Sequence, residues 1–76
     1  MQHDALDVRA IRLGTPGGIG DTQETFANFI GVSVKTVRNW EQGRREPSEA
    51  ARVLLSAIKR DPSSMVRIIN AAKAAA

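Results

Sequence analysis

Residues 23–42 read QETFANFIGVSVKTVRNWEQ, and two stretches with helical spacing lie on either side of a glycine in this segment. In the first stretch Phe26, Phe29 and Ile30 fall at positions i, i+3 and i+4, so they share one face of a helix. Gly31 follows at once and can take the left-handed conformation that ends many helices. We therefore predict a short amphipathic helix that stops at Gly31.

A second helix is predicted over Val34–Gln42. Ser33 precedes it, and a serine hydroxyl at this position can accept a hydrogen bond from a free backbone N–H group of the first turn. Val37 and Trp40 lie three residues apart and share the apolar face of this helix. Gly43 is predicted to end the helix in the left-handed conformation.

Two helices joined by a short turn that contains glycine are the layout of a helix-turn-helix unit. Counted from Gln23, the unit needs a small residue at its fifth position, where the helices cross, and Ala27 stands there. It needs a residue that tolerates positive φ at its ninth position, which is Gly31. Its fourth, eighth, tenth, fifteenth and eighteenth positions must be apolar, and the sequence supplies Phe26, Ile30, Val32, Val37 and Trp40. All of these requirements are met, so we predict a helix-turn-helix over residues 22–42.

Residues 1–21 are predicted to form a first helix and a glycine-rich loop. The helix, of two to three turns, falls within residues 5–13, where the apolar residues are Leu6, Val8, Ile11 and Leu13. The segment Gly14–Gly20 holds four of the six glycines, and this density is typical of a mobile surface loop. A phosphate-binding loop is the alternative, but it needs Lys and then Ser or Thr after its last glycine, whereas Asp21 follows here. Asp21 or Thr22 is the predicted N-cap of the next helix.

Two further helices are predicted over residues 48–75. Ser48 is the N-cap of the first of them, which has an apolar stripe of Ala51, Leu54, Leu55 and Ile58. Asp61 caps the last helix and Pro62 occupies its first position. The apolar stripe of the last helix, predicted as core or as a dimer interface, consists of Met65, Ile68, Ile69 and Ala72. Because no strand-like alternation occurs, the predicted fold is all-α, with four or five short helices in a single domain over residues 1–76.

The chain has 76 residues and a net charge of +3, and this charge is distributed unevenly. Residues 1–30 carry two basic and four acidic side chains, whereas residues 31–76 carry nine basic and four acidic ones. The second part of the chain therefore has a net charge of +5, which indicates a polyanionic partner. A core this small rarely supplies more than about 3–5 kcal/mol of stability, so self-association is also expected.

Several classes of function are disfavoured by what the sequence lacks. There is no Cys, and the one histidine, His3, lies near the amino terminus, so we expect neither a metal site nor a cofactor. No Tyr is present and no pair of carboxylates falls in a segment predicted to form a cleft, so we expect no enzymatic activity. No apolar run approaches the roughly 18–20 residues of a membrane span, and residues 1–10 lack the pattern of a secretory signal. We therefore expect a cytoplasmic protein without a membrane partner.

Five short motifs stand out in the segment that follows the loop. They are TQETFA (residues 22–27), GVS (31–33), TV (36–37), WE (40–41) and GRR (43–45), the last followed by Pro47. With these motifs residues 22–60 resemble the XRE family of helix-turn-helix regulators, whose relatives include phage repressors. The resemblance implies a compact lambda-repressor-like domain that binds double-stranded DNA.

The first helix carries a further part of this resemblance. Arg9 and Arg12 resemble arginines of the family's first helix, which implies that one of them pairs with Glu41. The chain departs from the family at Gly14–Asp21, because in the family the first helix runs into the next through a tight turn.

The family resemblance also implies a way of reading DNA. The helix over Val34–Gln42 would lie in the major groove. Base-edge contacts are then implied for Val34, Lys35, Arg38 and Asn39. Contacts with the phosphate backbone, which position the protein without reading sequence, are implied for Gln23, Ser33, Thr36, Arg44 and Arg45. A homodimer on a palindromic operator would be the binding species.

The continuation through Ala50-Ala51-Arg52, Leu54-Leu55 and Asp61-Pro62 resembles the antitoxins of bacterial toxin–antitoxin operons. This implies a repressor that regulates its own operon and neutralises a toxin, which residues 1–21 or the alanine-rich tail would bind. Two alternatives stay open. One is a phage-type or stand-alone repressor without a toxin partner, and the other is a helical protein-interaction module that does not bind DNA.

Overall fold

The computed structural model describes residues 6–75, and within this range the chain forms five helices and no strand. The helices are α1 (Val8–Leu13), α2 (Gln23–Ile30), α3 (Val34–Glu41), α4 (Glu49–Arg60) and α5 (Pro62–Ala75). The prediction of an all-α fold with four or five helices is confirmed. His3, and Ala5 at the start of the predicted first helix, lie outside the described residues. Of the five helices, none has both the length and the apolarity needed to cross a membrane.

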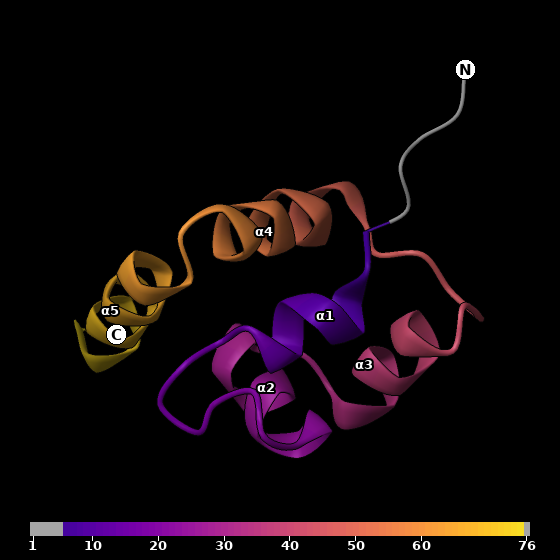
Figure 1. The fold of residues 1–76 in the computed structure, drawn as a ribbon, viewed down its shortest axis with the longest axis horizontal. Coiled ribbons are helices and arrows are strands. Elements are labelled where there is room, and N and C mark those ends of the chain that lie inside the picture. The colour runs from indigo at the N-terminus through magenta and orange to yellow at the C-terminus, as the bar shows by residue number, and fades with distance from the viewer. Residues whose placement is uncertain (1–5, 76) are drawn as a thin grey trace.

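The helices surround one apolar core. Figure 1 shows α1 between α4 on one side and α2 and α3 on the other, with α5 at the far end of the molecule from α3. The contacts agree with this view, because α1 packs against α3 and α4, and α2 packs against α3 and α5. The buried apolar residues are Val8, Ile11, Phe26, Ala27, Phe29, Val37, Leu55 and Ile58. Helix α5 has no buried residue and covers the core only with half-buried side chains.

The ends of α2 and α3 follow the signals in the sequence. Of the two predicted caps of α2, Thr22 is the one used: its hydroxyl accepts a hydrogen bond from the Thr25 N–H at 3.0 Å. Gly31 and Gly43 both adopt positive φ, at 84° and 74°, as predicted. Helix α3 ends at Glu41, one residue earlier than expected, because Gln42 is the C-cap, with a φ of −88° and a ψ of −2°.

The segment between α1 and α2 is held by more hydrogen bonds than its glycine content predicts. Thr15 is buried, and its hydroxyl donates to the Ile11 carbonyl at 2.9 Å. Further along the loop, the Thr25 hydroxyl donates to the Ile19 carbonyl at 2.8 Å, and Arg12 Nη1 donates to the Gly20 carbonyl at 2.9 Å. The long loop is therefore hydrogen-bonded to both flanking helices. Helix α1 packs against α3, as the family resemblance implies.

Candidate nucleic-acid interface

The helix-turn-helix formed by α2 and α3 has the packing that its sequence requires. Ala27 is buried where the two helices cross, and Phe26 and Val37 are fully buried beneath them. The other three apolar positions of the unit are half-buried and pack against the core: Ile30, Val32 and Trp40. The inward-facing residues are thus confirmed, and the opposite face of α3 is left to the solvent.

The four residues of α3 predicted to contact base edges differ in how far their side chains are exposed to solvent. Lys35 and Arg38 are exposed. Val34 and Asn39 are half-buried, and Val34 also packs against the core. Long cationic side chains of this kind can reach the edge of a base pair, so Lys35 and Arg38 are the strongest candidates for reading sequence.

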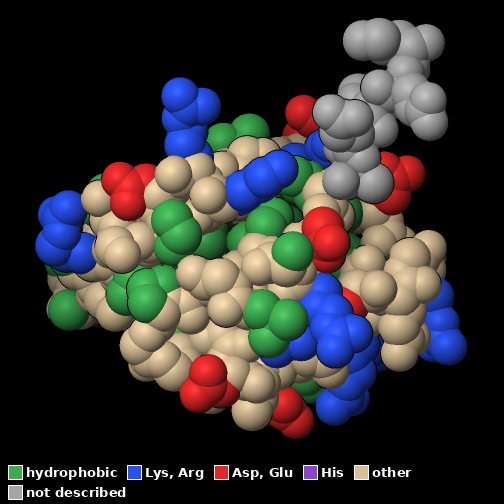
Figure 2. Space-filling model, in the orientation of Figure 1, with side chains coloured by type: hydrophobic (Ala, Val, Ile, Leu, Met, Phe, Trp, Pro, Cys, Tyr) green, Lys and Arg blue, Asp and Glu red, His purple; other side chains and the backbone are tan. Residues whose placement is uncertain are grey.

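Of the residues predicted to contact phosphates, Gln23 begins α2, and the other four lie at or just beyond the two ends of α3. At the amino-terminal end, the Ser33 hydroxyl accepts from the Thr36 N–H at 3.1 Å and lies 2.8 Å from the Thr36 hydroxyl. At the other end, the backbone N–H groups of Arg44 and Arg45 donate to the Asn39 carbonyl at 2.9 and 3.3 Å, and both side chains are exposed. In Figure 2, Lys and Arg side chains gather over the end of the molecule where Figure 1 places α3.

A buried ion pair fixes α1 to the carboxyl end of α3. Arg12 Nε lies 2.7 Å from Glu41 Oε2, and Arg12 Nη2 donates to Glu41 Oε1 at 3.2 Å. The two side chains are only 9% and 6% exposed. The pairing implied by the family resemblance is therefore confirmed for Arg12, whereas Arg9 is exposed and makes no salt bridge among residues 6–75.

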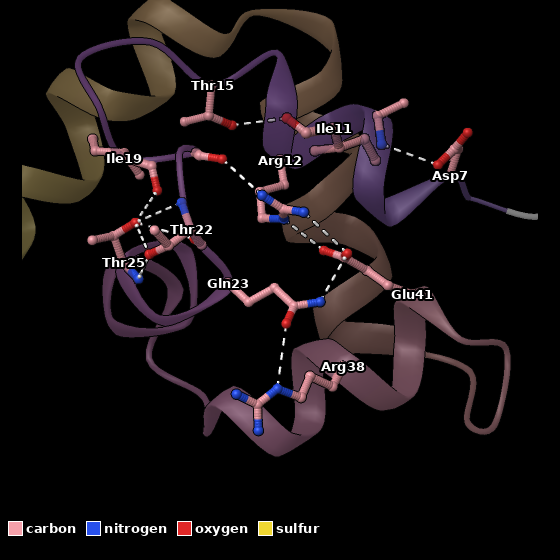
Figure 3. Close-up of polar contacts among 12 residues, drawn as sticks. Asp7, Ile11, Arg12, Thr15, Ile19, Thr22, Gln23, Thr25, Arg38 and Glu41 are labelled. Carbon is pink, nitrogen blue, oxygen red and sulfur yellow. Dashed lines mark hydrogen bonds and ion pairs between the residues drawn. The ribbon is translucent and has the colours of Figure 1, made fainter.

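Gln23 extends this pair towards the outer face of α3 (Figure 3). Its Nε2 donates to Glu41 Oε1 at 3.1 Å, and its Oε1 accepts from Arg38 Nε at 3.3 Å. A carboxylate can only accept, so Glu41 requires the amide nitrogen of Gln23 on its side and leaves the amide oxygen facing Arg38. Gln23, expected only as a phosphate contact, is thus also the link between the core and Arg38.

Glu24 was not among the residues predicted for this site, yet its Oε2 lies 3.7 Å from Arg38 Nη2. The two residues stand on different helices, so the spacing rules that identify neighbouring charges within one helix do not apply to them. The opposite signs of the two side chains were the only signal in the sequence, and they do not identify a pair.

We expect the contribution of Glu41 to stability to depend on pH. Burial raises the pKa of Glu41, but the hydrogen bonds from Arg12 and Gln23 outweigh it and hold the pKa below its ordinary value. A carboxylate with a lowered folded-state pKa stabilises the fold above its unfolded pKa, about 4.3 for Glu, and this stabilisation is lost as the pH falls through the folded pKa. The difference in unfolding free energy between the wild type and Glu41→Gln should therefore shrink in acid.

Urea denaturation from about pH 7 to about pH 3 measures this difference. Glu46→Gln, at an exposed position in the turn before α4, is the control and should change stability by less than about 0.5 kcal/mol. A Glu41→Gln difference that stayed constant over the whole range would contradict the coupling.

Comparison with known proteins identifies the unit formed by α2 and α3. A model of the helix-turn-helix family matches residues 19–58, just over half of the chain. This chain belongs to the XRE type of helix-turn-helix proteins. It is also similar to the protein named Antitoxin HigA-2 of Vibrio cholerae serotype O1 (strain ATCC 39315 / El Tor Inaba N16961), with 40% identity over 43 residues. The aligned segment spans 57% of this chain and 41% of that relative. Among solved structures no significant match was found.

Proposed function

We propose that this XRE-type protein binds double-stranded DNA sequence-specifically and represses transcription. The observation that carries the proposal is the outer face of α3, where Lys35 and Arg38 are exposed and Arg44 and Arg45 follow directly. With α3 in the major groove, lysine and arginine can donate to O6 and N7 of guanine. The two arginines after α3 would contact phosphates and position the helix without specifying sequence.

A salt titration of fluorescence anisotropy tests this proposal. The labelled duplex carries the DNA upstream of the protein's own gene, and a scrambled duplex of the same length is the control. Affinity for the upstream duplex should fall steeply as salt rises from about 50 to about 200 mM, and should exceed the affinity for the scrambled duplex. Equal affinity for both duplexes, or no dependence on salt, would contradict the proposal.

Substitutions on α3 and in the following turn should weaken binding in two different ways. Lys35→Ala should cost about 1–3 kcal/mol on the upstream duplex and relax specificity at one base pair. Arg45→Ala should weaken binding to all sequences alike, because a phosphate contact carries no sequence information. The measurement is anisotropy on duplexes in which each base pair is changed in turn.

Lys59→Ala is the matched control, because Lys59 is exposed on α4, outside the helix-turn-helix. It removes one positive charge and should leave specificity unchanged. If Lys59→Ala no longer distinguished the upstream duplex from duplexes with a changed base pair, or if Lys35→Ala still distinguished them as the wild type does, Lys35 would not be a residue that reads sequence.

The proposed DNA-binding form is a homodimer that uses α5. Ile68 is 50% exposed on this helix and Ala72 is exposed beside it. Met65 and Ile69 of the same predicted interface are half-buried and pack against the core. Ile68 and Ala72 are therefore the side chains of α5 that a partner would cover. Because α5 lies away from α3 (Figure 1), a dimer through α5 leaves both copies of α3 free for half-sites about 10 base pairs apart, or a multiple of that.

Ile68→Asp should weaken this dimer at least about tenfold, because it places a charge where the proposed dimer would bury an apolar side chain. Val53→Asp is the control, since Val53 is 69% exposed on α4 and lies outside the proposed interface. Sedimentation equilibrium measures the dissociation constant of each variant. An unchanged constant in Ile68→Asp, or an equal loss in both variants, would argue against α5 as the interface.

The proposed repressor is also an antitoxin that neutralises a toxin encoded by the neighbouring gene. Support comes from the similarity to a protein named as an antitoxin. Co-expression tests this proposal: the neighbouring gene should arrest growth when expressed alone and should be harmless together with this protein. A neighbour that is harmless alone would leave the stand-alone repressor as the better description, and failure to bind any duplex would favour the helical interaction module.

A further inference from the structure

In the free protein the Arg38 guanidinium contacts two side chains in the first turn of α2, those of Gln23 and Glu24. Its Nε donates to Gln23 Oε1 at 3.3 Å, and its Nη2 lies 3.7 Å from Glu24 Oε2. The side chains of Arg38 and Glu24 are 49% and 63% exposed, so their pair faces the solvent on the same side as the proposed DNA contacts. The guanidinium group thus donates a hydrogen bond to a neutral amide from Nε and forms an exposed ion pair with a carboxylate at Nη2.

These two contacts differ in how firmly they are anchored. Gln23 is fixed by Glu41, and Glu41 is held in turn by Arg12, as Figure 3 shows. Glu24 has no other salt bridge or side-chain hydrogen bond in the part of the chain that the structure describes. The contact with Gln23 is therefore tied to the core, whereas the contact with Glu24 depends on a solvated side chain that DNA can displace.

The two contacts also differ in what they leave free for DNA. A guanidinium group has five N–H donors, one on Nε and two on each terminal nitrogen. The bond from Nε to Gln23 leaves both terminal nitrogens available for the O6 and N7 atoms of a guanine. Glu24 Oε2 instead lies beside Nη2 at 3.7 Å, an ion-pair distance, and its charge has the same sign as the phosphates of an approaching duplex.

We propose that Glu24 lowers the DNA affinity of this protein by competing with DNA for the Nη2 end of Arg38. The proposal rests on DNA binding through α3, the function proposed above. Binding has to break the contact between Glu24 and Arg38, and the Gln23 contact persists and keeps the guanidinium group oriented. Glu24 is thus an affinity-determining residue that need not touch the DNA.

A double-mutant cycle tests this role with Glu24→Gln, Arg38→Ala and the combined variant, each titrated with the upstream duplex by anisotropy. At about 50 mM salt, Glu24→Gln should bind about two- to fivefold more tightly than the wild type, the range expected for loss of one exposed ion pair. In the Arg38→Ala background the same substitution should bring little gain, because the side chain with which Glu24 competes is gone.

Glu49→Gln is the charge-matched control, since Glu49 is exposed in the first turn of α4 and has no salt bridge among residues 6–75. It should change affinity less than Glu24→Gln does. An equal gain from Glu24→Gln in both backgrounds would reveal a general charge effect and overturn the competition, while the DNA-binding proposal would stand. Failure of the wild type to bind any duplex would overturn both.

Discussion

Replacing Arg12 with alanine is expected to cost about 3–5 kcal/mol, because it leaves a buried carboxylate without its partner. The Glu41 side chain is only 6% exposed, and the Gly20 carbonyl loses its hydrogen bond from Arg12 at the same time. A domain of this size has about 3–5 kcal/mol of stability in total, so Arg12→Ala should be largely unfolded at room temperature. The measurement is urea denaturation followed by circular dichroism.

Two further variants test whether the loss of stability comes from the ion pair between Arg12 and Glu41. Arg9→Ala removes an exposed arginine from the same helix and should change stability by less than about 0.5 kcal/mol. Arg12→Lys retains the charge but lacks the planar guanidinium that binds the carboxylate at two points, so it should fall between the wild type and Arg12→Ala. Arg12→Ala with the urea midpoint of the wild type would contradict the role assigned to the buried pair.

Gly20→Ala is expected to be the other severely destabilised variant, although it adds only a methyl group. A Cβ atom at this position would lie 1.7 Å from the Arg12 carbonyl oxygen and 2.8 Å from its carbonyl carbon. The obstacle is backbone and not a flexible side chain, so α1 and the loop would have to move apart. We expect a loss of about 3 kcal/mol or more, which is the upper range for overpacking.

Gly17→Ala separates this clash from the other reason why a loop requires glycine. Gly17 has a φ of 76°, and a Cβ atom there would meet no atom within 4 Å. Its cost should be only the penalty of a left-handed conformation, about 1–2 kcal/mol. Equal losses at the two positions by urea denaturation would indicate that backbone conformation alone explains them, and would contradict the proposed clash at Gly20.

Much of the fold could be predicted because its signals are local. The spacing of Phe26, Phe29 and Ile30 places them on one helix face irrespective of the rest of the chain. The ends of α2 and α3 depend on a hydroxyl cap or a left-handed glycine within a few residues of each end. The sequence does not decide whether the apolar stripe of α5 faces the core or an interface, because periodicity identifies an apolar face but not what covers it.

The contacts that connect separate elements could not be predicted from spacing. Arg12 and Glu41 are 29 residues apart, and their pairing was expected only through the family resemblance. The need for glycine at position 20 arises from the close approach of Arg12, which exists only after α1 and the loop have packed. For the same reason the sequence indicated which face of α3 was polar but did not show that Gln23 and Glu24 hold Arg38.

The central claim is that the outer face of α3 meets DNA, and mapping amide chemical shifts of the isotope-labelled protein tests it most directly. The protein is titrated with the upstream duplex and, separately, with the scrambled one. We predict that, on addition of the upstream duplex, the largest amide shift changes fall at residues 33–39 and 44–45, while the amides of α4 around Val53 change little. Two results would contradict the claim. One is that the largest amide shift changes fall on α4 or α5 while α3 is unaffected; the other is that both duplexes give the same pattern of shift changes and bind equally strongly.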